Sequence, residues 1–369
     1  MKKTLIIVGV FVLSMMCVTS SFAHWQHRPG AVYAMTNAPE GNEVVAFDRS
    51  AKGMLKFMAS YPTQGLGSGG NAVDALGSQG ALVLTQDERW LLAVNAGSNQ
   101  ISVFRVLPDG LKLTDVVGSG GEFPVSLAPY HDLLYVLNAG SEGGKATIAG
   151  FRLNHRGKLI SLQDSIRPLE GNGYHQVGFD PRGRVLVVTQ GIPEVINDIL
   201  VFSVDKDGLP GAAPVISPSE GVVPFGFIFD ARGHLLVSEA GSGAVSSYKI
   251  LKDNSLQTIS SSVANGQTAT CWIVGNRRGF VYTANTGSGT ISAYKLKPRE
   301  GRLVLVDAEA GSGNAPIDMT TTTNGLFLYA LNANDGTVGA FRIRSDGSLK
   351  DLGVTGGLPA PFAQGIVGR

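Results

Sequence analysis

The sequence predicts an all-β fold: a seven-bladed β-propeller with four antiparallel strands per blade, its ring closed by pairing the N- and C-terminal segments in one blade. Three observations support this prediction. A strand pattern recurs seven times, its aromatic residues are spaced 46 to 57 residues apart, and the two ends of the chain carry complementary parts of one unit. No amphipathic helical period appears after the N-terminal apolar stretch.

The third strand of each unit has a β-branched or aliphatic residue three positions before an aromatic residue, as in "VVAF", "ISVF" and "ISAY". A residue that tolerates positive φ follows each aromatic after six or seven positions, which predicts a hairpin turn. These turn residues are Gly53, Gly110, Gly157, Gly208, Asn254, Gly301 and Gly347.

The other strands are placed around this hairpin. A second strand such as "LLYVLN" or "FVYTAN" comes before it, preceded by a turn such as "DPRGR" or "NRRGF" and by an apolar first strand such as "HQVGF". A solenoid is the alternative for repeats of this length. The C-terminal "PAPFAQGIVGR" resembles a first strand without partners, and "RPGAVYAM" resembles a second strand without a first, so a closed ring is favoured.

The N-terminus predicts export. A basic "MKK", an apolar "TLIIVGVFVLSMMCV" and small residues before His24 are typical of a secretory signal peptide over 1–23, which leaves 24–369 as a single propeller domain. A membrane anchor is the alternative, but the apolar run is short for a span. Cys17 follows Met16 where a lipoprotein site needs a small residue. We therefore expect a periplasmic or secreted protein with no membrane span after cleavage.

Composition limits the partners. Without the leader only Cys271 remains, so no intramolecular disulfide can form and the fold must depend on its hydrophobic core. The formal net charge of +1 falls to near zero with the loss of Lys2 and Lys3. This balance predicts no nucleic-acid partner and no anionic membrane partner. We expect a monomer that takes a small-molecule ligand, with an envelope protein as another partner class.

Short motifs give little support for a cofactor. "GLGSGG" over 65–70 matches G-x-G-x-x-G, but no helix is expected after it, so it is interpreted as an inserted flexible loop. "HWQH" over 24–27 offers two histidines, too few for a structural zinc site. H-E-x-x-H, G-x-S-x-G and a c-type haem motif are missing from the sequence. We expect no cofactor and no metal.

Residues that interrupt the repeat are the candidates for a site. The position that leads into the first strand should lie at the mouth of the central channel, where propellers offer a ligand site. Its occupants are small or apolar except for His175, the titratable exception. The aligned residues are Gly80, Phe123, His175, Phe225, Cys271, Ile317 and Phe362.

The end of the second strand should lie at the same mouth. Amides dominate this position, with Asn138, Gln190 and Asn285 among them, and Glu239 is the only acid. His175 and Glu239 belong to successive blades and are predicted to act as an acid–base pair, with Asn138, Tyr174, Gln190 and Asn285 binding substrate. The alternatives are structural: His175 bonds a backbone carbonyl beside Tyr174, and Glu239 caps its own turn.

These motifs resemble the bacterial lactonase family, which includes the propeller-type 6-phosphogluconolactonase and fungal carboxymuconate cyclase. The likeness extends over 29–369. "GYHQVGFDPRGR" is similar to a family motif with a His-Pro-His start and keeps the second histidine as His175, while "SEA" keeps the acid of an "N-E-L" motif as Glu239. The resemblance implies lactone hydrolysis or formation at the channel mouth.

Two departures bear on the substrate. Phe225 in "VPFGF" and Thr286 in "ANTG" stand where the family pattern has arginines, which would suit a carboxylate or phosphate. A phosphorylated sugar lactone or a tricarboxylate-like substrate is therefore disfavoured. Two functions remain: an exported lactone hydrolase or cyclase that uses His175 and Glu239, and a non-catalytic propeller that binds a small ligand or an envelope protein.

Overall fold

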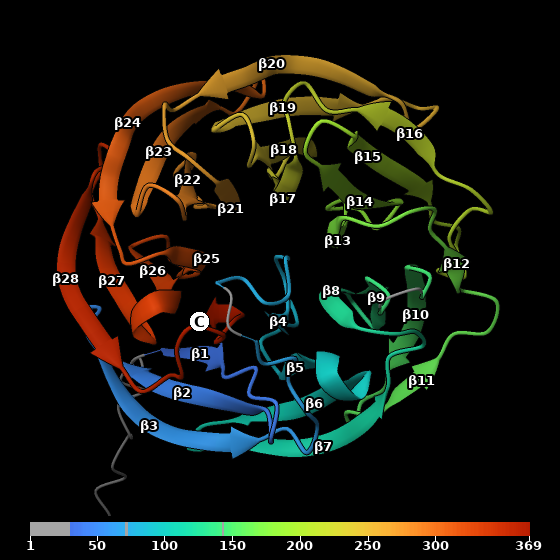
Figure 1. Cartoon of the computed structure of the whole chain (residues 1–369), viewed down its shortest axis with the longest axis horizontal. Helices are drawn as coiled ribbons and strands as arrows, with labels where there is room; N and C mark the ends of the chain where they lie inside the picture. The colour runs from blue at the N-terminus through green and yellow to red at the C-terminus, as the bar shows by residue number, and fades with distance from the viewer. Residues whose placement is uncertain (1–29, 71–72, 142–143) are drawn as a thin grey trace, which may run out of the picture.

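Seven sheets, six of four strands and one with a short fifth strand, stand around a central channel in the computed structural model, which describes residues 30–70, 73–141 and 144–369 (Figure 1). Within these residues all regular structure is β-sheet apart from two short 3₁₀ turns, η1 (Ala96–Ser98) and η2 (Ala333–Asp335). The predicted seven-bladed propeller is confirmed. The predicted signal peptide, Cys17 and "HWQH" lie outside the described residues, and no helix among the described residues is long and apolar enough to cross a membrane.

Each blade follows the order first, second, third and fourth strand from the channel outward. The closing blade contains β29 (Ile366–Gly368), β1 (Ala31–Met35), β2 (Glu43–Arg49) and β3 (Leu55–Pro62). Blade 2 contains β4 (Leu82–Leu84), β5 (Trp90–Asn95), β6 (Gln100–Leu107) and β7 (Gly110–Gly118). Blade 3 contains β8 (Pro124–Tyr130), β9 (Leu133–Asn138), β10 (Thr147–Leu153), β11 (Leu159–Ser161) and the short β12 (Arg167–Pro168).

The remaining four blades repeat this plan. Blade 4 contains β13 (Tyr174–Phe179), β14 (Val185–Ile192), β15 (Ile196–Ser203) and β16 (Val215–Pro218). Blade 5 contains β17 (Pro224–Phe229), β18 (His234–Glu239), β19 (Ala244–Ile250) and β20 (Leu256–Ala264). Blade 6 contains β21 (Thr270–Gly275), β22 (Phe280–Asn285), β23 (Thr290–Lys297) and β24 (Arg302–Ser312). Blade 7 contains β25 (Pro316–Thr321), β26 (Phe327–Asn332), β27 (Thr337–Ile343) and β28 (Leu349–Gly356).

The two ends of the chain meet in the closing blade, as predicted. β29 pairs antiparallel with β1, and Tyr33 lies opposite Val367 in the register. This pairing supplies the innermost strand that the N-terminal segment lacks, so the first and last segments complete one sheet and leave no unpaired edge between them.

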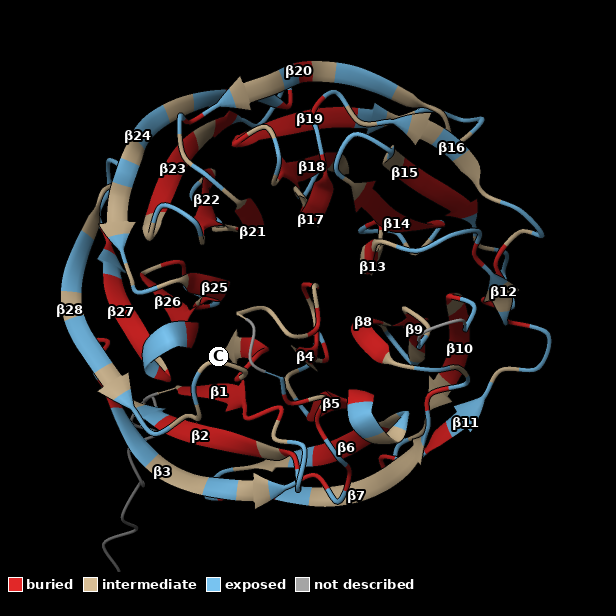
Figure 2. Ribbon diagram, viewed as in Figure 1, coloured by how far each residue is buried: buried red, intermediate tan, exposed pale blue. Residues whose placement is uncertain are grey.

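The core lies between the blades, and the second and third strands of each sheet are mostly buried while the outer fourth strand is mostly intermediate or exposed (Figure 2). Tyrosines of second strands bond across to the next blade: Tyr282 Oη donates to Gly347 O at 2.9 Å, and Tyr329 Oη to Gly53 O at 2.9 Å. Both glycines have φ near +90°, and a Cβ at Gly347 would meet the Phe280 ring at 2.3 Å. The predicted turn glycines therefore also permit blade packing.

The ring has two unlike faces. We call the side with the turns from first to second and from third to fourth strands the turn face, and the side with the other connections the loop face. In the described connections of the loop face, Lys145 and Arg167 are the only lysine or arginine. Acids prevail there: Glu40, Asp74, Glu122, Asp164, Glu170, Glu194, Glu220 and Asp335. The turn-face connections carry both cations and acids, so a net charge near zero conceals an excess of acids on the loop face.

Candidate functional site

His175 lies on β13 at the loop face, and both of its ring nitrogens face backbone carbonyls. Nδ1 is 2.7 Å from Gly77 O, and Nε2 is 3.0 Å from Gly191 O. The ring stacks on Phe225 with centroids 4.3 Å apart. Burial lowers the pKa of His175, opposed by the contacts with Gly77 and Gly191, so the neutral ring is favoured at neutral pH. Neither nitrogen is directed into open space, where a general base would meet substrate.

Glu239 ends β18 and is completely buried within its own blade. Its Oε1 accepts hydrogen bonds from Ser246 Oγ at 2.6 Å, Ser219 Oγ at 3.0 Å and Gly221 N at 2.8 Å. Its Oε2 accepts one from Ser262 Oγ at 2.8 Å. The carboxylate therefore ties the connection before β17 to β19 and β20. Among the described residues no hydrogen bond joins Glu239 to His175.

The amides predicted to bind substrate are, like Glu239, hydrogen-bonded to the loops and strands around them. Asn285 is fully buried, accepts from Thr270 Oγ1 at 2.7 Å and donates to Ser292 Oγ at 2.8 Å. Gln190 donates to the carbonyls of Glu170 and Asn172. Each side chain holds the connection that leads into its blade. At this position the structure places Asn95, Asn138, Gln190, Glu239, Asn285 and Asn332.

Asn138 and Tyr174 are also enclosed. Asn138 donates to Ser119 O at 3.4 Å and to Thr147 Oγ1 at 3.3 Å, and its Oδ1 has no partner among the described residues. Tyr174 Oη donates to Glu170 O at 2.6 Å, and burial raises the pKa of the phenol. The structure thus places the six predicted residues near the loop face, each in contact with neighbouring loop or strand groups; their roles toward substrate stay predictions.

The loop face of the channel is occupied by the chain itself. Residues 73–80, which we call the channel segment, run into the middle of the ring before β4 (Figure 1). Ser78 O accepts from Trp272 Nε1 at 3.0 Å, and Gln79 exchanges two side-chain hydrogen bonds with the backbone of Ile273. Gln364 of the C-terminal segment donates to Asp74 Oδ1 at 2.5 Å and to Ser78 O at 3.2 Å. The segment thereby bonds to blade 6 and to the closing blade.

The neighbouring "GLGSGG" loop is also attached. Gly67 N donates to Ala38 O at 2.8 Å, and Ser68 N donates to Asn37 Oδ1 at 2.9 Å. The loop position predicted for 65–70 between two blades is confirmed. The predicted flexibility is not supported for these residues, since backbone groups of the preceding loop hold them.

A cavity of about 390 Å³ lies in the central channel on the turn-face side of the channel segment. Asp318, 4% exposed, lines it from β25. The pKa of Asp318 is raised to about 7, mainly by burial and with a smaller contribution from Asp74, against hydrogen bonds from the backbone N–H groups of Ile366 and Met319. A carboxyl with a pKa near the working pH can both take and give a proton.

Local geometry explains why this side chain faces the channel. The first strand of blade 7 has a bulge between Ile317 and Met319, and Asp318 adopts φ of 43° there. A bulge re-aims one side chain and breaks the strict alternation of the strand. Two residues later, Thr320 lines the same cavity; its Oγ1 accepts from Gly368 N at 3.0 Å. Among the described residues its own hydroxyl proton has no acceptor.

Comparison with known proteins now identifies the fold family. The family described as "Lactonase, 7-bladed beta-propeller" matches residues 24–171 and 144–363. The chain belongs to this lactonase family. A candidate 6-phosphogluconolactonase from Bacteroides uniformis is 19% identical with a TM-score of 0.70, covering 91% of this chain and 99% of that one. The periplasmic gluconolactonase of Pseudomonas aeruginosa is 19% identical with a TM-score of 0.65, covering 91% and 98%.

A curated relative from Staphylococcus aureus strain USA300, an uncharacterized protein, is 33% identical over 91 residues. The matched region makes up 24% of this chain and 26% of that relative, so the chain aligns with about a quarter of the relative's length. At the identities found, the solved structures establish the lactonase fold and leave the reaction to be argued from the residues of this chain.

Sequence reasoning missed Asp318 and Thr320, which line the channel cavity. Asp318 is the only acid in the seven innermost strands, and "PIDMTT" contains it in an otherwise apolar stretch, a signal that could have been used. The register also corrects the alignment: Val125, and not Phe123, is equivalent to His175, because Pro124 pairs with Asn138 as Tyr174 pairs with Gln190.

Proposed function

We propose that the protein hydrolyses a lactone in the central channel with Asp318 as the acid–base group. The observation that carries the proposal is a carboxyl in the channel cavity whose pKa is raised to about 7 by burial. Membership of the lactonase family supports the reaction class. The departures at Phe225 and Thr286 favour a substrate without a phosphate group, because no arginine stands at either position.

The chemistry follows from the two protonation states of Asp318. The carboxylate takes a proton from water as the water oxygen bonds to the lactone carbonyl carbon. The tetrahedral intermediate then breaks its ring C–O bond, and the protonated Asp318 returns the proton to the leaving alkoxide, which gives a hydroxy acid. The free hydroxyl proton of Thr320 is available to the developing oxyanion.

That His175 and Glu239 act as an acid–base pair remains a second proposal, less well supported than the role of Asp318. The ring nitrogens of His175 face Gly77 O and Gly191 O, and the Glu239 carboxylate accepts four hydrogen bonds, so both groups must first lose these partners before they meet substrate. Catalysis at this end would also require the channel segment to move.

The test is turnover of γ- and δ-lactones, neutral and carboxylated, by wild type and three variants in a pH-stat. Asp318→Asn should lower kcat at least about 100-fold, while His175→Ala and Glu239→Gln keep most of it after correction for folded fraction. Wild-type turnover by Asp318→Asn would overturn the assignment. If His175→Ala or Glu239→Gln lost turnover while Asp318→Asn kept it, the reaction would be assigned to the loop face instead.

A second function, ligand binding without turnover, is favoured by the state of the predicted site residues: five are buried, and the ring nitrogens of the partly exposed His175 both face backbone carbonyls. It predicts that a lactone raises Tm with the logarithm of its concentration above Kd, while no acid is released.

Export and a single domain over 24–369 also remain proposals, supported by the N-terminal sequence; a mature protein that begins at His24 by N-terminal sequencing would establish cleavage.

A further inference from the structure

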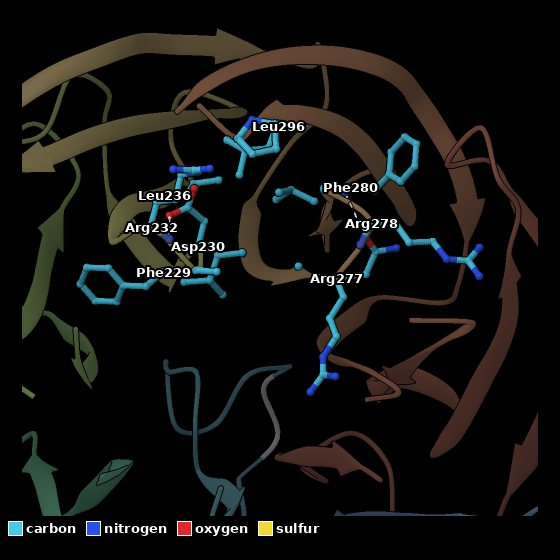
Figure 3. Close-up of a pocket in the computed structure, with 15 residues that line it drawn as sticks. Phe229, Asp230, Arg232, Leu236, Arg277, Arg278, Phe280 and Leu296 are labelled. Carbon is cyan, nitrogen blue, oxygen red and sulfur yellow. Dashed lines mark hydrogen bonds between the residues drawn. The ribbon is translucent and has the colours of Figure 1, made fainter. Parts of the chain in front are cut away.

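A second cavity lies on the turn face between blades 5 and 6 and adjoins the channel cavity, with which it shares Ile228 and Gly275. Its volume is about 500 Å³, within the range of small-molecule sites. The turn that joins β17 to β18 forms one wall, and the turn that joins β21 to β22 forms the other (Figure 3).

The floor of this cavity is apolar. Leu236 is fully buried, Val281 is 2% exposed and Leu296 is 5% exposed, and these three side chains belong to one packed cluster beneath the opening. Such a floor offers an apolar ligand body the burial that favours binding, at about 25 cal/mol per Å².

The rim of the cavity is cationic. Arg232 stands on one wall, and Arg277 and Arg278 leave the opposite turn in different directions (Figure 3). All three are exposed, and among the described residues none of their side chains has an ion pair. The nearest acid, Asp230, is already engaged: it accepts from His234 Nδ1 at 2.7 Å and from the backbone of Arg232 at 2.8 Å.

The adjoining cavity adds to this charge. It has a volume of about 600 Å³, shares Ala231 and Arg232 with the first and is also lined by Arg182, Lys249 and Lys252. Its acid, Asp180, is paired with Arg184 at 3.4 Å. The field at Arg232 is therefore positive from both sides.

An equivalent cavity between blades 2 and 3 provides an internal comparison. Its volume is about 490 Å³, but its cation and acids compensate each other: Arg89 lies 3.8 Å from Asp87, and Asp132 pairs with Arg152 at 2.6 Å. The excess of unpaired cations is a property of the cavity between blades 5 and 6, and not of propeller turns in general.

We propose that the cavity between blades 5 and 6 binds an amphipathic organic anion: an apolar body lies on Leu236, Val281 and Leu296, and its anionic group pairs with Arg232 and Arg277. An apolar floor beneath guanidinium groups fits this ligand class better than a neutral molecule or a bare inorganic anion. Arginine suits the anionic group because its planar donors bind carboxylate or phosphate in pairs.

The probes are 2-naphthoate, its neutral counterpart 2-naphthol, 2-naphthyl phosphate and inorganic phosphate, titrated into the full protein by calorimetry. Naphthoate should bind at least about tenfold more tightly than naphthol and inorganic phosphate, and more weakly at high salt. Naphthyl phosphate separates the two anionic groups: tighter binding than naphthoate assigns a phosphate ligand, and the reverse a carboxylate.

Variants locate the binding. Ala231→Trp should abolish it by filling the shared wall, and Arg232→Gln should weaken it about tenfold. Arg89→Gln, in the compensated cavity, is the matched control and should change nothing. Equal affinity for naphthol, or unchanged naphthoate binding in both Ala231→Trp and Arg232→Gln, would overturn the proposal. These readouts do not depend on turnover, so they stand apart from the lactone assay.

Discussion

The two faces of this propeller differ in what their polar groups do. On the loop face the polar side chains are used to join chain segments: Glu239 accepts four hydrogen bonds, and the channel segment bonds to Trp272 and Gln364. On the turn face, cations such as Arg232 and Arg277 have no ion pair among the described residues, and cavities open beside them. The same repeat therefore builds a bonded end and an end with groups available to a ligand.

This difference teaches that an exceptional residue in a repeat need not be a functional one. Glu239 differs from the amides of its column, yet it does the same work of holding the connection into its blade. Asp318 also differs from its neighbours, but it faces a cavity and has a pKa raised to about 7. Surroundings, and not rarity alone, separate the two acids.

The largest expected effect tests the structural role of the loop face. Glu239→Ala removes the acceptor for Ser246, Ser219, Gly221 and Ser262 and should lower the free energy of unfolding by about 3–5 kcal/mol. Urea unfolding measures the change, with exposed Glu194→Ala as the control that stays within about 0.5 kcal/mol. A loss below about 1 kcal/mol would show that this carboxylate is not structural.

The next effect concerns the pH dependence of stability. The pKa of Asp318 is about 7 in the fold against an ordinary 3.8, so the folded state holds this proton more tightly. Its contribution to stability is full below pH 3.8 and is lost as the pH rises through 7. Asp318→Asn should therefore stabilise the protein at pH 8 by on the order of 3 kcal/mol and change little at pH 4.

Urea unfolding of wild type and Asp318→Asn at pH 4 and pH 8 measures this effect, with Glu194→Gln as the charge-matched control. An Asp318→Asn variant that is less stable than wild type at pH 8 would mean that the carboxylate is the form that the fold favours, contrary to the expected proton uptake.

A smaller effect tests how the channel segment is held. His175→Ala removes the ring contacts with Gly77 O and Gly191 O and the stack on Phe225, at a cost of about 1–2 kcal/mol. Hydrogen exchange should show about tenfold less protection at Gln79 N, with Leu92 in β5 unchanged. Unaltered protection at Gln79 would mean that the other bonds of the segment suffice.

The smallest effect lies on the turn face. Lys295→Met removes the cation above the Phe280 ring and the bond to Arg278 O, which should cost about 0.5–1 kcal/mol. The exposed neighbour Lys297→Met is the control. Thermal unfolding of both variants at low and high salt distinguishes loss of the contact with Phe280 from loss of one positive charge. An equal change in both variants would assign the effect to net charge alone.

The sequence was sufficient for the blades because each strand is specified locally. An aromatic residue in the third strand and a turn residue after it recur in every blade, and all seven predicted turn residues have positive φ. The closing of the ring could also be predicted, since β29 and β1 are complementary fragments of one repeat.

The channel segment could not be predicted in the same way. It follows no repeat, and its place depends on partners remote in sequence, such as Gly77 with His175 and Ser78 with Trp272. The acidic loop face was hidden for a similar reason: net charge sums over the chain, whereas the fold sorts strand turns and loops to opposite ends of the ring.

The most direct test of the central claim is the pH dependence of kcat/KM for lactone hydrolysis by wild type, Asp318→Asn and His175→Ala. We predict a rate that rises with an apparent pKa near 7 in wild type and in His175→Ala, and that is lost in Asp318→Asn. The same pH profile in Asp318→Asn, or activity that disappears only in a fully folded His175→Ala, would contradict the account.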